Sequence, residues 1–333
     1  MVTNTENNIS YQYFTLYPYF IPVWGKRQSI LVNVLKGEYF NIPNSLFEIL
    51  KDTNESIKVE EISSKIPKCN SDDVENILKY LVREGVGVFT SDFNLFKKLN
   101  FEFNSPYIIN NAIIEIDDLK TYCLTSLLKD LHEINCQNIE IRIINSHVFD
   151  EVIQILTKYE NSIFRSIQLI CFSNEHIMNN SLNLIERNRK ISKVLIFDSK
   201  NTEVKKSKSC HKTIYISEIY KEQLDEVDFI INPFYFFESH HYNASFNQKL
   251  SIDKNGNIKN HLTHDKTFGN INNKKLKSIL KDTDFQSLWY ITNDSIEICK
   301  ECELRYFCLS FSDVSKVNGK CFKNNYCNNK VKV

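Results

Sequence analysis

The sequence Cys299-Lys300-Glu301-Cys302-Glu303-Leu304-Arg305-Tyr306-Phe307-Cys308 organises the end of this chain, and Cys321 and Cys327 follow it. Five of the ten cysteines lie in this region. Two cysteines separated by two residues form a chelating turn, because one tight turn directs both sulfurs at a single ion. A third cysteine five residues on and a fourth after a loop complete a tetrahedral thiolate set for zinc or an iron–sulfur cluster. The alternative is a group of buried or disulfide-bonded thiols.

The composition around this stretch excludes several classes of function. The whole chain has 333 residues, 42% of them hydrophobic, which suffices for two or three domains. Only 7 glycines and 6 prolines occur, which argues against glycine-rich phosphate loops. Lys and Arg number 41, as do Asp and Glu, so no net field attracts nucleic acid or an anionic membrane. No apolar run reaches the roughly 20 residues that span a bilayer, and the polar N-terminus lacks a secretory signal. We therefore expect a cytoplasmic protein with reduced thiols.

Residues 1–98 predict a winged-helix-like domain. The pattern indicates strands at 13–17, 29–35 and 38–42, helices at 46–50, 59–66 and 71–85, and a returning strand at 87–90. This segment carries 11 Lys and Arg against 12 Asp and Glu, so the basic surface that DNA requires is missing. The other use of this architecture is to bind a peptide as an added strand on an exposed sheet edge.

Residues 99–235 predict an α/β domain. Apolar strands are expected at 108–116, 139–144, 166–171, 193–197, 213–216 and 229–231, with helices at 118–134, 150–159 and 179–189 between them. Such alternation indicates right-handed βαβ units and a parallel sheet, open or partly closed into a barrel. Residues 236–333 follow as a third domain, with a hairpin at 249–261, a helix at 275–280 and the cysteines.

Several strings in this order resemble the SPASM-domain proteins of radical-SAM peptide maturation, and more closely the SPASM-domain peptide maturases of "grasp-with-spasm" systems. The strings are Ile42-Pro-Asn-Ser-Leu-Phe-Glu-Ile-Leu, Ile109-Asn-Asn-Ala-Ile-Ile-Glu-Ile-Asp, Ile252-Asp-Lys-Asn-Gly-Asn-Ile-Lys-Asn, Phe268-Gly-Asn-Ile and Cys299-x2-Cys302-Glu-x-Arg-Tyr-x2-Cys308. The resemblance implies a degenerate partial (β/α) radical-SAM-like barrel at 99–235 and a cysteine-rich SPASM domain at 236–333.

The resemblance implies one auxiliary [4Fe–4S] cluster, or Zn²⁺, held by Cys299, Cys302, Cys308 and Cys321, with Cys327 as an alternative fourth ligand. The family's second cluster motif is changed here. Gly256 and the spacing of four residues after it are kept, but His261 stands where the motif expects a cysteine. His241 and Ser312 stand at two further positions where the family has cysteine. We expect this second cluster to be lost. The histidines His240, His241, His261 and His264 either hold a different ion or are solvated side chains of surface loops.

The radical-SAM motif itself is missing from the sequence. Catalysis in that family needs a C-x3-C-x2-C loop after the first barrel strand, and only Cys123 follows that strand closely. The chain should therefore not cleave S-adenosylmethionine. We interpret the isolated cysteines as buried small apolar residues: Cys69, Cys123, Cys136, Cys171 and Cys210.

The resemblance also implies that the N-terminal domain accepts the leader of a precursor peptide beside its third helix. The expected peptide-binding residues are Glu38, Tyr39, Phe40, Asn41, Ile42, Asp73, Asn76, Ile77 and Tyr80. The first hypothesis is a non-catalytic adaptor in ribosomal-peptide maturation, with a precursor leader and an ATP-grasp ligase as partners and without nucleic acid or membrane. An iron–sulfur peptide-modifying enzyme and a zinc-dependent DNA-binding regulator are the alternatives.

Overall fold

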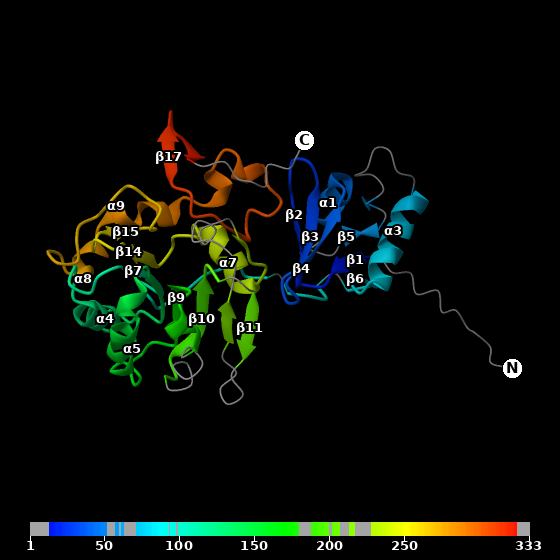
Figure 1. The fold of residues 1–333 in the computed structure, drawn as a ribbon. Coiled ribbons are helices and arrows are strands. Elements are labelled where there is room, and N and C mark those ends of the chain that lie inside the picture. The colour runs from blue at the N-terminus through cyan, green and yellow to red at the C-terminus, as the bar shows by residue number, and fades with distance from the viewer. Residues whose placement is uncertain are drawn as a thin grey trace. The chain divides into compact units, whose positions relative to one another are not determined.

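The apolar strands in the middle of the chain form one open, mostly parallel sheet of eight strands in a computed structural model of the protein (Figure 1). The structure describes residues 13–51, 57–59, 61–62, 71–92, 94–97, 99–179, 188–199, 202–206, 213–216 and 228–324. The chain divides into two compact units. Unit 1 comprises residues 1–103, 229–241 and 293–308, and unit 2 comprises residues 104–228, 242–292 and 309–333.

The large sheet belongs to unit 2. Its strands, in spatial order, are β11 (Glu203–Lys206), β12 (Thr213–Ile216), β10 (Ile191–Phe197), β9 (Ser166–Phe172), β8 (Asn138–Ile143), β7 (Asn111–Ile116), β14 (Lys249–Ile252) and β15 (Ile258–Lys259). The six strands from β12 to β14 are parallel to their neighbours, whereas β11 and β15 pair antiparallel at the two edges. The sheet is not closed into a barrel.

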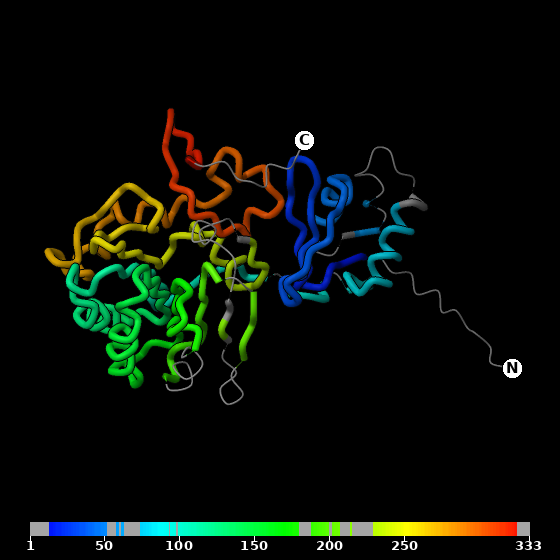
Figure 2. The backbone as a smooth tube through the Cα atoms, in the orientation of Figure 1, coloured from blue at the N-terminus to red at the C-terminus, as the bar shows by residue number. Residues whose placement is uncertain are grey.

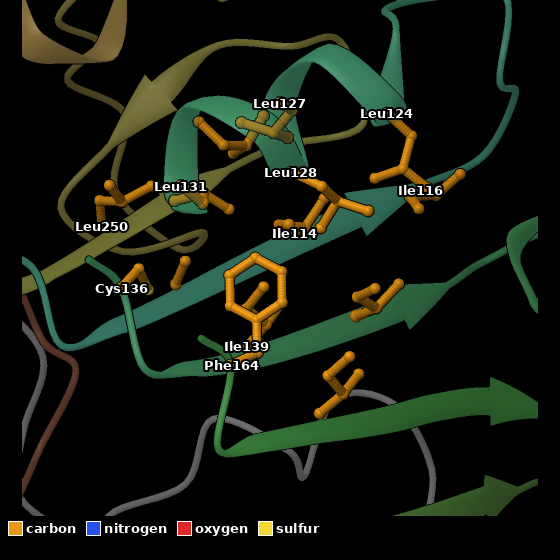
Figure 3. Packing of buried hydrophobic residues seen from close by; sticks show 14 of the residues in the cluster. Ile114, Ile116, Leu124, Leu127, Leu128, Leu131, Cys136, Ile139, Phe164 and Leu250 are labelled. Atoms are coloured by element: carbon orange, nitrogen blue, oxygen red, sulfur yellow. The ribbon is translucent and has the colours of Figure 1, made fainter. Parts of the chain in front are cut away.

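Helices α4 (Leu124–Glu133) and α5 (Phe149–Thr157) cover one face of this sheet. Leucines recur at helical spacing in α4, so that Leu124, Leu127, Leu128 and Leu131 all face inward. They pack on alternate strand residues such as Ile114 and Ile139, as Figure 3 shows. Burial of these side chains is the main force that holds unit 2 together, at about 1.5–3 kcal/mol for each.

The predicted strands of this unit are largely confirmed, with three differences. The strand expected at 229–231 is β13 (Asp228–Phe229), which pairs with β16 (Cys308–Leu309) outside the large sheet. The hairpin expected at 249–261 is present, but β14 joins the large sheet beside β7. The antiparallel edge strand β11 was not predicted. Most of the helix expected at 179–189 lies outside the described residues.

Among the described residues, unit 1 contains two three-stranded sheets. In the first sheet β1 (Tyr13–Leu16) lies between β5 (Ile57–Lys58) and β6 (Gly87–Thr90). In the second, β3 (Ser29–Asn33) lies between β2 (Phe20–Val23) and β4 (Glu38–Ile42). Strand β2 was not predicted because Pro22 interrupts its short apolar run. A proline is tolerated there because β2 lies at the edge of its sheet.

Helix α3 (Ser71–Arg83) provides much of the core between these sheets. Val74, Leu78 and Leu81 are buried together with α1 (Asn44–Leu50) and with strand residues of both sheets. The helix ends at Arg83, and Gly85 follows with a φ of +69°. Val86 N–H donates to Leu81 C=O at 2.9 Å and Gly85 N–H to Val82 C=O at 3.0 Å, and the two bonds form a Schellman motif.

Strand β3 is buried along its whole length because both faces of its sheet are covered. Leu31 faces the core formed with α1 and α3, called the helical core below. Ile30 and Val32 belong to a second core on the opposite face. The second core is closed by Phe236 of α7 (Pro233–His241) and by Phe307 near the cysteines. Segments from the end of the sequence therefore fold onto the N-terminal sheet within unit 1. Figure 2 follows this path through the backbone colours.

Across the described residues, no helix combines the length and apolar character needed to cross a bilayer.

Candidate functional site

The first candidate site is the outer edge of β4. This strand pairs only with β3 among the described strands, so its other edge presents backbone N–H and C=O groups without a strand partner. Four of its five residues, Glu38, Tyr39, Phe40 and Asn41, are exposed, and only Ile42 is buried. The exposed fraction is 44% for Tyr39 and 51% for Phe40. An apolar, exposed edge strand is a template for another extended chain.

The register places the two exposed rings of β4 on opposite faces of the sheet. Phe40 lies opposite Leu31, which faces the helical core, and Tyr39 lies opposite Val32, which faces the second core. Side chains of a strand alternate between faces, so Phe40 shares the helix-covered face with Ile42. A strand added beside β4 would therefore place every second side chain on the face of the sheet that Phe40 occupies.

Helix α3 carries the other residues predicted to bind peptide. Of these, Asn76 and Ile77 lie four and three residues before Tyr80, so the three share one side of the helix, and the side chain of Asp73 lies outside the described part of the chain. Asn76 and Tyr80 are exposed, and Ile77 is half-buried at the margin of the helical core. The Arg83 guanidinium lies 5.2 Å from the centre of the Tyr80 ring. The helix thus offers an exposed amide, Asn76, and an exposed aromatic ring, Tyr80.

The second candidate site is the turn at the first cysteine pair. Residues Cys299–Glu301 form a 3₁₀ turn, η5, and Cys302 N–H donates to Cys299 C=O at 2.9 Å. The C-x2-C spacing itself is common at zinc and iron–sulfur sites. Both cysteines are partly exposed, and Cys308 is buried in β16. The pair therefore has suitable donors and a suitable turn for a thiophilic ion.

The full thiolate set is not assembled in the described part of the chain. There, no group of three or more His, Cys, Asp or Glu residues is arranged to hold a metal ion. Cys299, Cys302 and Cys308 belong to unit 1, whereas Cys321 lies in unit 2 on β18 (Lys320–Lys323), opposite Lys316 of β17 (Val314–Val317). Cys327 lies outside the described residues. The four-cysteine site remains a proposal.

The paired histidines at the end of α7 are packed within unit 1. His240 stacks between Phe101 and Tyr306, with ring centroids 5.0 and 4.1 Å away. Its Nδ1–H donates to Phe236 C=O at 2.7 Å, and burial lowers the pKa of the imidazole, which favours the neutral ring. His241 is exposed, and its Nε2 lies 2.7 Å from Phe101 C=O.

The other two histidines are buried in unit 2. His261 and His264 are 2% and 4% exposed, so the interpretation as solvated loop side chains is wrong for both. Their rings lie 6.0 Å apart, and His261 stacks on Phe311 at 4.2 Å. His264 Nε2–H donates to Phe311 C=O at 3.0 Å. His240 and His241 belong to unit 1, so the predicted four-histidine group is divided between the units.

The isolated cysteines follow the prediction in two of the three described cases. Cys136 and Cys171 are buried, and burial raises the pKa of each thiol to about 12. Cys123 is exposed in the segment between β7 and α4, so the expectation that it is buried is wrong. Cys69 and Cys210 lie outside the described residues.

Sequence reasoning missed the residues that hold the cysteine turn in place. Arg305 Nη1 donates to Cys302 C=O at 2.9 Å and to Trp24 C=O at 2.6 Å, and its Nε donates to Asp294 Oδ1 at 2.7 Å. The Arg305 side chain is 10% exposed. The available signal was Arg305 itself, a lone arginine within the cysteine motif, but its partner Trp24 is too far away in the sequence to be identified from a local pattern.

No family model and no curated protein matches the chain. The crystal structure of Streptococcus suis SuiB is similar to it, with 10% identity over 88% of this chain and 94% of that chain, and a TM-score of 0.27. A TM-score this low supports no conclusion about fold or function.

Proposed function

We propose that this chain binds the leader of a ribosomally made precursor peptide as an added strand on β4, and presents the rest of the peptide to a partner ATP-grasp ligase. In this proposal the chain makes no radicals and acts as an adaptor. The observation that carries it is the exposed edge of β4, with Phe40 on its helix-covered face and an exposed side of α3 in the same unit.

The physical basis is strand addition. An extended peptide beside β4 completes the hydrogen bonds of the open edge, and these main-chain bonds supply affinity for any sequence. Selectivity then comes from alternate side chains of the peptide. Those that share the face of Phe40 should be apolar, because they would cover a ring that is now 51% exposed.

The thiolates have a structural part in this proposal. Cys299, Cys302 and Cys308, with Cys321 or Cys327 as the fourth ligand, would hold a [4Fe–4S] cluster or Zn²⁺. The group supplies folding free energy when it is bound, because ligation orders short loops that bury few apolar side chains.

Strand addition is tested with N-methylated peptides. Synthetic leaders of the short peptides encoded beside the gene are titrated into the full chain by calorimetry, and backbone nitrogens of a binding leader are then methylated one at a time. We expect weakening at every second position, because alternate N–H groups of an added strand point at β4. Equal tolerance of methylation at all positions, or no binding of any leader, would contradict the proposal.

Side-chain variants locate the binding edge. Phe40→Ala should weaken leader binding, whereas Val317→Ala, which removes an equally exposed side chain from β17 in unit 2, should leave it unchanged. The adaptor role is tested by incubating precursor, ligase and ATP with and without this chain. Modification should require the chain, and a change in precursor mass without the ligase would instead favour the peptide-modifying enzyme.

A further inference from the structure

The antiparallel strand β11 forms one edge of the large sheet in unit 2 (Figure 1). Among the described strands it pairs only with β12, so the backbone N–H and C=O groups on its other side have no strand partner there. Three of its four residues are exposed, and Val204 among them is 51% exposed. An edge of this kind can accept another extended chain.

The register of β11 with β12 assigns its side chains to the two faces of the sheet. Lys205 lies opposite Ile214, which belongs to the core on the helix-covered face. Glu203 is two residues away and shares that face, and its Oε2 lies 3.6 Å from Lys205 Nζ. Val204 lies on the opposite face. One face of the edge therefore carries a Glu–Lys pair, and the other carries an exposed valine.

Symmetry limits how this edge could pair with a copy of itself. Two identical edge strands pair antiparallel about a two-fold axis perpendicular to the sheet. Residues that lie opposite one another point to the same face, and this axis leaves every residue on its own face. One residue must therefore lie opposite its own copy. Lysines on an edge strand oppose pairing where they would meet like charges, so charge decides which register is allowed.

The register centred on Val204 is the one that pairs opposite charges across the axis. It places Glu203 of each copy opposite Lys205 of the other, and it brings the two exposed valines together. Registers centred on Glu203, Lys205 or Lys206 instead place two like charges directly opposite each other. With the Glu203–Lys205 pair within each strand, the two cross-strand pairs complete a ring of four alternating charges.

The open edge of β4 has no such selection. Glu38 is its one charged residue, and a register centred on Phe40 would place that carboxylate opposite Ile42 of a second copy. No cross-strand charge pair therefore favours one register of β4 over another. The two edges suit different occupants, because β11 is complementary to itself and β4 is not.

We propose that β11 is the interface of a homodimer, in which this edge pairs antiparallel with the β11 edge of a second copy about a two-fold axis at Val204. Backbone hydrogen bonds across the axis would join the two eight-stranded sheets into one. Four residues on each side bury less than the roughly 1,200 Å² of a standard interface, so the dimer is reversible. The inference does not depend on the proposed peptide binding, since β4 belongs to unit 1.

Sedimentation velocity on the full chain tests this interface. The unaltered chain should shift from monomer to dimer as its concentration is raised. Glu203→Lys makes positions 203 and 205 both basic, and Lys205→Glu makes both acidic, so each variant alone should dimerise at least about tenfold more weakly. Lys316→Glu reverses an exposed charge on β17 of unit 2. It is the matched control and should dimerise as the unaltered chain does.

A mixture of the two edge variants separates loss of pairing from loss of folding. In an equimolar mixture, the basic edge of Glu203→Lys faces the acidic edge of Lys205→Glu, so both cross-strand charge pairs are again opposite in sign. The mixture should therefore recover dimers, and a fluorescent label on one variant verifies that each dimer contains both chains. Circular dichroism verifies that each variant is folded.

Three results would overturn the inference. The first is an unaltered chain that stays monomeric at every concentration. The second is a single edge variant that dimerises as tightly as the unaltered chain, which would place the interface on another surface. The third is a mixture of the two edge variants that contains no mixed dimer.

Discussion

The imidazole of His240 stacks on the phenol ring of Tyr306, with centroids 4.1 Å apart and planes 11° from parallel. Phe101 covers the other face of His240 at 5.0 Å. A helix residue, a residue of the cysteine segment and a residue that follows the N-terminal sheets thus form one stack. The imidazole is partly buried there, and burial lowers its pKa.

We predict that this stack loses stability as the pH falls. The pKa of His240 is near 6.5 in the unfolded chain and lower in the folded protein, so the unfolded state binds the proton first. Stability from this group is present above about pH 6.5 and is lost as the pH falls toward the lowered pKa. Urea unfolding at pH 7.5 and 5.5 measures the difference. The difference in the free energy of unfolding between the two pH values should be smaller in His240→Gln.

We predict that native-state alkylation distinguishes three thiols. Cys123 is exposed, whereas burial raises the pKa of Cys136 and Cys171 to about 12, so almost no thiolate is present at pH 8. Iodoacetamide should therefore label Cys123 within minutes and leave Cys136 and Cys171 unlabelled until urea is added. Peptide mass spectrometry gives the result for each site, and labelling of Cys136 or Cys171 at the rate of Cys123 would refute their burial.

We predict that two neighbouring positions of α3 separate stability from peptide binding. Leu78 is fully buried, so Leu78→Ala should lower the free energy of unfolding by about 2–5 kcal/mol. Tyr80 is 53% exposed, so Tyr80→Ala should change stability by less than about 0.5 kcal/mol while it weakens leader binding. Chemical denaturation and calorimetry give the two values. Equal effects of both variants on stability would contradict this packing of the helix.

The sequence predicts those parts of the fold that depend on local patterns. The leucines of α4, the glycine that ends α3 and the apolar runs of β7 to β10 each contain their own signal. The pairing of β14 with β7 and the contact of Trp24 with Arg305 connect residues that are far apart, so no local period indicates them. The histidines show the same limit, because the burial of His261 depends on Phe311 stacking from another segment.

We predict that Arg305 stabilises unit 1 through hydrogen bonds and not through charge alone. Arg305→Lys keeps the positive charge but loses the geometry that reaches Trp24 C=O and Cys302 C=O, so unfolding should become easier by about 1–3 kcal/mol. Lys26→Ala removes an exposed ion pair and should cost no more than about 1 kcal/mol. Urea unfolding followed by Trp24 fluorescence, in a Trp289→Phe background, reports on unit 1. A larger loss of unfolding free energy for Lys26→Ala than for Arg305→Lys would contradict this role of Arg305.

We predict that the protein purified without oxygen carries one thiolate-bound inorganic centre. The C-x2-C turn is already formed, and its two sulfurs are partly exposed, so an ion can reach them. Cys299→Ser should reduce bound iron or zinc to well below one equivalent and lower the melting temperature, because ligation of structural ions contributes directly to folding. Cys123→Ser should change neither value. Absorption near 400 nm with stoichiometric iron would identify an iron–sulfur cluster, and colourless protein with one zinc would identify the ion instead. Unaltered protein with neither metal would refute the site.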